Sequence, residues 1–283
     1  MPDPTPRPAD HPQLAPTRVR ALRRRILAWY AANARELPWR RTTDPYAILV
    51  SEVMLQQTQV PRVVPKYLDW IDGFPTLEAL AAAPLADVLR RWQGLGYNNR
   101  ARRLHDCAAA AVAARGPSLP AALPRSREEL GALPGIGPYT AGAVLIFAHN
   151  DDLAAVDANV RRVLTHELAL PEELSRPGLQ AVAEAVLPRG RSRDWHNALM
   201  DYGALVLTAR RTGIASRGRQ GAFEGSRRQQ RARLLRHLLE HGPVETPELA
   251  AVLGLPVAAV VELAALLERD GLVRREGGRV AVA

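Results

Sequence analysis

The sequence predicts an all-α fold followed by a small winged-helix-like module. Through residues 18–211, apolar side chains recur three and four positions apart, which is the period of an amphipathic helix. No stretch there alternates polar and apolar residues for long enough to favour a strand. The composition then shifts to Gly, Ser and Arg over residues 212–228, which is typical of a linker. Of the 283 residues, 47% are hydrophobic and 24% are charged, so the chain can bury a full core.

The first half of the chain contains a series of expected helices. Residues 1–17 are Pro-rich and polar and are expected to be a disordered tail. A helix follows over 19–33 and ends at LPWR. Pro45 is expected to begin another helix that runs to residue 71 with an interruption near Pro61 and Pro65.

Three turns divide the helices that come next. They are expected at FPT (74–76), at residues 82–87 and at GLGY (94–97), where Gly and Pro interrupt the helical pattern. Short helices are expected between them.

Residues 229–283 form the expected C-terminal module. A helix ended by Gly242 precedes two further helices and a hairpin around Gly277 and Gly278. Helix–turn–helix followed by a β-wing indicates a winged helix, a common DNA-binding module. The alternative is a small cap that does not contact DNA.

The charge balance indicates a polyanionic partner. The formal net charge is +9, carried almost entirely by arginine, with Lys66 the only lysine. Nucleic acid is the first candidate and an acidic membrane surface the second. No apolar run approaches the ~20 residues that span a bilayer, and the N-terminus has no signal-peptide pattern. We therefore expect a cytoplasmic, nucleoid-associated protein with no membrane partner.

The single cysteine, Cys107, excludes an internal disulfide and a four-cysteine metal site. It lies in an alanine-rich helix, where a small buried apolar role is expected.

The segment LPGIGPYTAGAV (133–144) predicts two helices joined by a tight turn. Gly135 and Gly137 flank Ile136, and glycine permits positive φ and close backbone approach. The N–H groups at the start of the second helix suit a phosphate, so this hairpin is interpreted as a DNA-backbone contact. A plain connecting turn is the alternative.

Two carboxylates are the candidate catalytic groups. Asp157, in AAVDANVRRVL (154–164), stands just before an expected helix start, where it can serve as an N-cap, a catalytic group or both. Glu52 interrupts the apolar stretch ILVSEVML. A carboxyl group in apolar surroundings has a raised pKa and can donate a proton near neutrality. A surface glutamate on an amphipathic face is the alternative for Glu52.

Several motifs in a fixed order resemble the helix-hairpin-helix glycosylase superfamily, and within it the adenine DNA glycosylase (MutY) family. They span residues 20–210 and are LPWR, DPYAILVSEVMLQQTQV, FPTLEALAAAP, GLGY with RARRLH, LPGIGPYTAGAV, VDANVRRVL and LMDYGALV. The resemblance implies a two-lobed all-α glycosylase domain over 18–211, with the target nucleotide flipped into a cleft between the lobes.

The resemblance also implies roles for particular residues. Glu52 would protonate the purine at N7, and Asp157 would stabilise the oxocarbenium-like sugar and help deliver water to C1′. Tyr139 and Asn159 match residues that support Asp157. The expected adenine pocket comprises Leu37, Arg40 and Asp201. Residues expected to contact DNA are Gln56, Gln57, Tyr97, Gly135, Ile136, Gly137 and Thr140, with Gln57 and Tyr97 as duplex wedges.

The position of Tyr139 bears on the type of reaction. Relatives resembling endonuclease III carry a lysine there, which forms a Schiff base and cleaves the strand. Because this chain has tyrosine, the resemblance implies a monofunctional enzyme without β-lyase activity.

The chain departs from the family pattern in its cofactor and accessory domain. Leu207 stands where the first of four cluster-ligating cysteines is usual, so no iron–sulfur cluster can form by cysteine ligation. We expect no cofactor, although the resemblance allows a monovalent cation at the hairpin. Residues 229–283 are too few for the Nudix-like domain that reads 8-oxoguanine in relatives.

The target base is the alternative that the sequence leaves open. Ala158 replaces a usual glycine and Asn98 a usual tyrosine, and DAN with Tyr139 is also similar to thymine/uracil mismatch glycosylases. The leading hypothesis is excision of adenine opposite 8-oxoguanine or guanine from double-stranded DNA by a monomer. A thymine/uracil mismatch glycosylase comes second, and a non-catalytic DNA-binding protein third.

Overall fold

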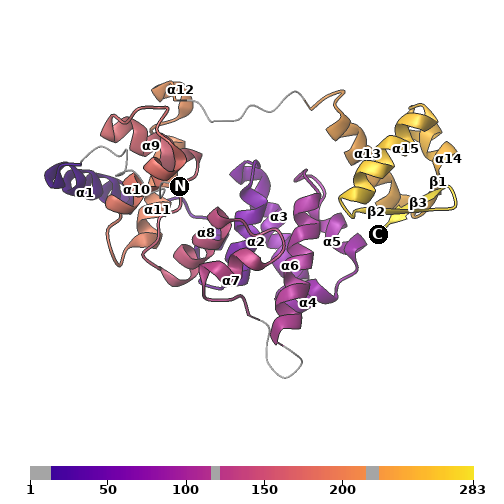
Figure 1. The fold of residues 1–283 in the computed structure, drawn as a ribbon, viewed down its shortest axis with the longest axis horizontal. Coiled ribbons are helices and arrows are strands. Elements are labelled where there is room, and N and C mark those ends of the chain that lie inside the picture. Colours follow the sequence, from indigo (N-terminus) through magenta and orange to yellow (C-terminus); the bar gives the residue numbers. More distant parts are fainter. Residues whose placement is uncertain (1–13, 116–121, 215–222) are drawn as a thin grey trace, which may run out of the picture. The chain divides into compact units, whose positions relative to one another are not determined.

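The computed structural model describes residues 14–115, 122–214 and 223–283 (Figure 1). Two compact units divide the chain. The first combines Met1–Ile48 with Gly137–Arg219, and the second combines Leu49–Ile136 with Gln220–Ala283. Each unit is therefore built from segments that are far apart in the sequence, and each is described by itself.

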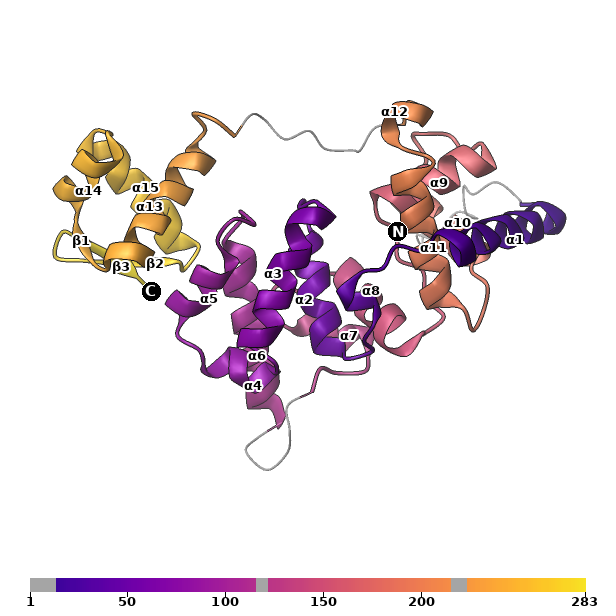
Figure 2. The same ribbon diagram turned by 180° about the vertical axis from the view of Figure 1, so that it is seen from behind.

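In the part that the structure describes, the regular elements of the first unit are all helices. Helix α1 (Pro16–Asn33) packs against α11 (Ser192–Leu205), which packs in turn against α9 (Ala158–Leu168), and Figures 1 and 2 show these segments side by side. Its core is apolar and fully buried, as at Ile26, Val160 and Trp195. The other elements are η1 (Pro38–Arg40), α8 (Pro138–His149), α10 (Arg176–Ala185) and α12 (Ala209–Thr212).

The helix α2 (Pro45–Leu55) begins in the first unit and ends in the second. It starts at Pro45 as expected, because Asp44 caps it. The carboxylate of Asp44 accepts hydrogen bonds from the N–H groups of Tyr46 at 3.0 Å and Ala47 at 3.3 Å.

The N-terminal part of the second unit packs around indole rings. The rings of Trp70 and Trp92 meet edge to face with centroids 5.5 Å apart, and both side chains are fully buried. Helices α4 and α5 both pack on α6. The elements are α3 (Val60–Gly73), α4 (Leu77–Ala82), α5 (Leu85–Trp92), α6 (Asn99–Arg115) and α7 (Arg127–Ala132).

The C-terminal segment has the element order of a winged helix, which confirms that expectation. Its three strands form an antiparallel sheet in the order β1-β3-β2. The turn at Gly277 and Gly278, both with positive φ, joins β2 to β3 as predicted. The elements are α13 (Arg227–His241), β1 (Val244–Glu245), α14 (Thr246–Leu253), α15 (Val257–Arg269), β2 (Val273–Glu276) and β3 (Arg279–Val282).

Several predicted boundaries differ from those observed. The expected interruption near Pro61 and Pro65 lies earlier, at residues 56–59, and Pro65 lies inside α3. The first residues of a helix have no intrahelical acceptor for their N–H groups, so a proline there loses no hydrogen bond. This explains why Pro61 lies in the first turn of α3. The expected turn at 82–87 is shorter, because α5 already begins at Leu85.

The predicted tail and linker both overlap helices at their ends. Helix α1 begins at Pro16, inside the expected tail of residues 1–17. Thr212 ends α12 and Arg227 begins α13, so both ends of the expected linker 212–228 are helical. Residues 1–13 of the predicted tail and 215–222 of the predicted linker lie outside the described residues.

Among the described residues, no single helix is long and apolar enough to cross a membrane. The pair α14 and α15 passes that test of length and composition when taken together, with a 105° bend between the two helices.

Candidate active site and DNA-contact residues

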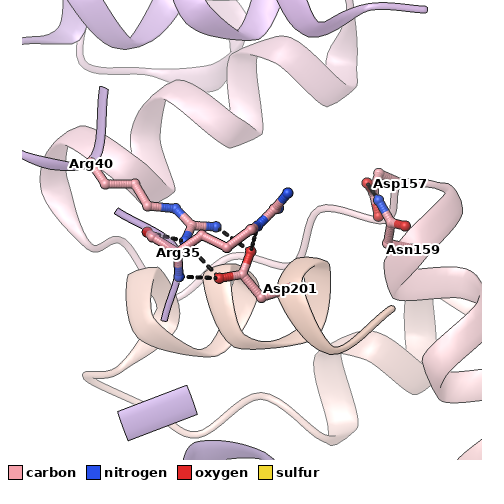
Figure 3. A network of polar contacts seen from close by, with 5 residues as sticks. All are labelled: Arg35, Arg40, Asp157, Asn159 and Asp201. Carbon is pink, nitrogen blue, oxygen red and sulfur yellow. Dashed lines mark hydrogen bonds and ion pairs between the residues drawn. The ribbon is translucent and has the colours of Figure 1, made fainter. Parts of the chain in front are cut away.

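The carboxylate of Asp157 lies at the start of α9 and is its N-cap. One oxygen accepts a hydrogen bond from the N–H of Val160 at 2.6 Å. The other accepts one from Nδ2 of Asn159 at 2.9 Å, and Figure 3 shows these two side chains together. Burial raises the pKa of Asp157 above the usual 3.8, and these hydrogen bonds and the charge of Arg162 oppose that rise. Asp157 is therefore confirmed as an N-cap. This role is compatible with catalysis, because an ionised carboxylate that caps a helix can still stabilise a positive charge near it.

A buried arginine fixes the orientation of the Asn159 amide. Arg162 is 6% exposed, and its guanidinium donates to Oδ1 of Asn159 at 2.6 Å. Arginine has donors only, so the amide must present its oxygen to Arg162 and its NH2 to Asp157. Burial lowers the pKa of Arg162, and the charge of Asp157 acts against that shift. Arg162 therefore donates a hydrogen bond to Asn159, and Asn159 donates one to Asp157.

The same guanidinium joins α9 to the end of α11. It donates to the backbone carbonyls of Gly203 at 2.6 Å and Leu207 at 2.5 Å. A Cβ at position 203 would lie 2.8 Å from Cβ of Asn159, so only glycine lets the two helices approach this closely. Sequence reasoning missed both Arg162 and Gly203. The signals were present in the motifs VDANVRRVL and LMDYGALV.

The loop that leads into Asp157 is held by a buried histidine. His196 is 1% exposed; its Nδ1 donates to the carbonyl of Ser192 at 2.7 Å, and its Nε2 accepts from the N–H of Ala155 at 3.0 Å. Burial lowers the pKa of His196, with the Ser192 contact opposing. Protonation would remove the acceptor for Ala155, so the neutral imidazole is the form that supports this loop.

Asp201 is fully buried and binds two arginines. Arg40 donates from both of its terminal nitrogens at 2.8 Å, and Arg35 donates from Nε at 2.7 Å and from its backbone N–H at 3.0 Å (Figure 3). Burial raises the pKa of Asp201, but the hydrogen bonds and charges of Arg40 and Arg35 outweigh it, and the net pKa lies below 3.8. Arg35 was not anticipated from the sequence.

This network includes two of the three residues that the resemblance assigns to the base pocket, Arg40 and Asp201. The third, Leu37, is the N-cap of η1 and is 7% exposed. Arg40 also donates to the carbonyl of Arg35 at 3.1 Å and lies over the ring of Tyr30 at 5.9 Å. The LPWR motif is therefore fixed to α11 by the ion pair of Arg40 with Asp201.

Glu52 is buried within α2 at 9% exposure. The alternative of a surface glutamate is therefore wrong. Its neighbours in the helix, Ser51 and Val53, are buried as well, so the apolar setting that the sequence indicated is present. Glu52 belongs to the second unit and Asp157 to the first. The roles of the two residues as proton donor and cation stabiliser stay predictions.

The hairpin differs in detail from the sequence expectation. Gly135 has φ of 76°, and a Cβ there would lie 2.6 Å from Cβ of Arg103, so glycine is required on both counts. Gly137 has an ordinary φ of −87°. The side chains of Ile136 and Thr140 are buried at 6% and 3% exposure. A DNA contact by these two residues would therefore use backbone groups.

Tyr139 and the wedge candidates have accessible side chains. Tyr139 is half-buried in the first turn of α8. Gln56 and Gln57 are exposed after α2, and Tyr97 is 37% exposed before α6. Gln57 and Tyr97 both have left-handed backbones, with φ of 57° and 47°. Such geometry brings these polar and aromatic side chains to the surface, as contacts with DNA require.

The residues near Leu207 do not fit an iron–sulfur cluster. Leu207 is 6% exposed and packs in the core of the first unit. Cys107, the only cysteine of the chain, is buried in the other unit, and burial raises the pKa of its thiol to about 12. Across the three described ranges, no group of His, Cys, Asp or Glu is arranged to hold a metal ion. The monovalent cation that the resemblance allows at the hairpin stays a prediction.

Comparison with known proteins defines the class of this chain. Residues 50–187 match the family described as HhH-GPD superfamily base excision DNA repair protein. The fold agrees: an endonuclease III–DNA complex superposes with a TM-score of 0.60 over 70% of this chain and 89% of that one, at 21% identity. Residues 50–187 therefore form a domain of the HhH-GPD superfamily.

Within this superfamily, the chain is similar to proteins named adenine DNA glycosylase. It is 45% identical over 188 residues to the Mycolicibacterium smegmatis protein, covering 65% of this chain and 63% of that one. The human protein is 40% identical over 206 residues, covering 68% and 37%. The chain thus spans less than two thirds of these relatives. A thermostable thymine-DNA glycosylase is 29% identical, with a TM-score of 0.64 over 69% of this chain and 90% of that one.

Replacing Asp201 by Asn is expected to lower the free energy of unfolding by about 3 kcal/mol, because two partly buried guanidinium groups lose their counter-charge. Urea unfolding at pH 7 measures the change. Asp194→Asn is the matched control, since Asp194 lies on the same helix in an exposed pair with Arg191 and should cost less than about 1 kcal/mol. Equal effects of the two substitutions would contradict the assignment of Asp201 as the centre of the network.

Replacing Asn159 by Leu is expected to raise the pKa of Asp157 further, because the substitution removes a hydrogen bond that favours the ionised carboxylate. The carboxyl group then stays protonated up to a higher pH. An NMR titration of the Asp157 carboxyl carbon measures the shift directly. Asn33→Leu, which removes an exposed side chain bonded only locally to the Trp29 carbonyl, should leave it unchanged. An unaltered or lower pKa in the Asn159 variant would show that the amide does not stabilise the charge.

Proposed function

We propose that this chain is a monofunctional DNA glycosylase that hydrolyses the N-glycosidic bond of adenine mispaired with 8-oxoguanine or guanine. The observation that carries the proposal is the carboxyl group of Asp157, which accepts hydrogen bonds from Val160 and from an amide whose orientation Arg162 fixes. A preorganised carboxylate of this kind stabilises positive charge that develops beside it. The similarity to proteins named adenine DNA glycosylase supports the choice of base.

The reaction divides between the two carboxyl groups. Glu52 donates a proton to N7 of adenine, so the base leaves as a neutral species with the electron pair of the bond to C1′. Asp157 stabilises the resulting cationic sugar, and water adds to C1′ while Asp157 accepts its proton. The products are free adenine and an abasic site. Because Tyr139 takes the place of a lysine nucleophile, the strand stays intact.

The partner in this proposal is double-stranded DNA carrying a mismatch or an oxidised base. The net charge of +9 supports binding to a polyanion. We further propose that the protein acts as a monomer in the nucleoid.

A second candidate is excision of thymine or uracil opposite guanine. It is favoured by the 29% identity to a thymine-DNA glycosylase over 90% of that chain, and by alanine at position 158. Thymine and uracil have no N7 to protonate, so under this alternative Glu52 has no acid role while Asp157 keeps its own.

The proposal is tested with duplexes carrying A·8-oxoG, A·G, T·G or U·G, each treated with alkali after incubation to reveal abasic sites. Product from the adenine duplexes is expected, with an Asp157→Asn variant that binds duplex but yields none. Glu52→Gln, which keeps the shape of the side chain, should lower adenine release by at least about 100-fold. Product from T·G or U·G alone would establish the second candidate, and binding without product would indicate a non-catalytic DNA-binding protein.

We also propose that the chain acts without an iron–sulfur cluster. Leu207 occupies the place of the expected first ligand and is part of the core. Purified active protein is expected to contain less than about one tenth of an iron atom per chain, because cluster binding needs several thiolates. Elemental analysis with a visible absorbance spectrum measures this, and stoichiometric iron that is lost together with activity would overturn the proposal.

A further inference from the structure

The two loops that carry the wedge candidates both contain a strained backbone. Gln57, after α2, has φ of 57°, and Tyr97, before α6, has φ of 47°. Neither residue is glycine or asparagine, the types that adopt the left-handed region readily. Such conformations persist where the surrounding contacts fix them. Something in the second unit must therefore hold each loop.

One side chain contacts both loops. Arg100, in the first turn of α6, is 7% exposed. At the end of α2, its guanidinium donates to the carbonyls of Val53 at 2.8 Å and Met54 at 3.0 Å. In the loop that follows, it donates to the carbonyl of Gln56 at 2.6 Å and to the hydroxyl of Thr58 at 3.2 Å. In the second loop, it donates to the carbonyls of Leu95 and Gly96, each at 3.1 Å.

Three of these acceptors lie immediately beside the strained residues. Gln56 and Thr58 flank Gln57, and Gly96 precedes Tyr97. The carbonyls at the end of α2 have no partner within the helix and lie at the negative end of its dipole, so a cation there is favourable. Burial lowers the pKa of Arg100 to about 10, which still leaves it charged at neutral pH.

Two aromatic rings complete the surroundings. The guanidinium carbon lies 5.1 Å from the ring centre of Trp92, which belongs to the core, and 5.6 Å from that of Tyr97. Arg100 thus contacts the side chain of one wedge candidate, Tyr97, and the residues on both sides of the other, Gln57. A lysine has a single ammonium group and cannot replace a planar fork that reaches both loops.

We propose that Arg100 is a positioning residue that holds the Gln57 and Tyr97 loops together, so that both side chains enter the duplex as one rigid element. The inference rests on the proposed function, since it assumes that these side chains open DNA. It assigns Arg100 to the extrusion of the target nucleotide and gives it no part in breaking the glycosidic bond.

The test separates extrusion from bond cleavage in the full-length protein. One duplex carries 2-aminopurine beside an adenine opposite 8-oxoguanine, so that its fluorescence rises when the stack opens. A second duplex places the same adenine in a three-nucleotide unpaired bubble, where opening is already complete. Arg100→Lys and Arg100→Gln are compared with wild type for the fluorescence rise and for the single-turnover rate on each substrate.

The expected result is a loss on the order of 10- to 100-fold in rate on the paired duplex, with a reduced fluorescence rise and a rate on the bubble within about threefold of wild type. Arg91→Gln is the matched control. Arg91 is another arginine of the second unit that donates to a backbone carbonyl, that of Asp69 at 2.7 Å, and it also donates to the carboxylate of Asp69 at 2.8 Å. Both contacts lie outside the two loops, so the ratio of the two rates should not change.

Equal losses on the two substrates would overturn the proposal, because a purely structural role lowers both alike, and so would no loss on either. If both Arg100 variants fail to fold, Thr58→Val removes one acceptor only and should shift the ratio in the same direction. If wild type releases no base from either substrate, the proposed function fails instead. The fluorescence rise, which needs no cleavage, then still decides the role of Arg100.

Discussion

The close contact between α9 and α11 is the constraint on which the rest of the candidate site depends. A glycine at position 203 allows the contact, and the buried guanidinium of Arg162 holds it by donating to the carbonyls of Gly203 in α11 and of Leu207 just after that helix. The same guanidinium orients Asn159, which donates to Asp157. The packing of the two helices therefore determines the position of the Asp157 carboxylate. Deep burial of a charged group is costly, and here the guanidinium donates hydrogen bonds to three oxygen atoms, those of Asn159, Gly203 and Leu207.

Much of the fold could be predicted from the sequence because its signals are local. Helical periodicity located the helices, and the paired glycines located the β-turn near the end of the chain. Asp157 and Glu52 were found for the same reason: one precedes a helical pattern and the other interrupts an apolar run. In each case the property that mattered, capping or burial, is decided by a few neighbouring residues.

The residues that escaped prediction act over long sequence distances. Arg35 and Asp201 are 166 positions apart, and Arg162 and Leu207 are 45 apart. No local pattern distinguishes a buried arginine from the many exposed ones in so basic a chain. The two-residue strand β1 forms through its pairing with β3, which is distant in the sequence. The helix break expected near Pro65 was wrong, because the low helix propensity of one residue does not outweigh the packing of the whole of α3.

The position of Asp157 as an N-cap ties chemistry to helix formation. The carboxylate that is proposed to face the sugar is also the group that closes the first turn of α9, so it cannot reorient unless that turn opens. If the first turn of α9 frays, the carboxylate oxygens of Asp157 therefore move out of position at the same time. Any change that loosens α9, however far from the substrate, would act on the reaction as directly as a change to the carboxylate itself.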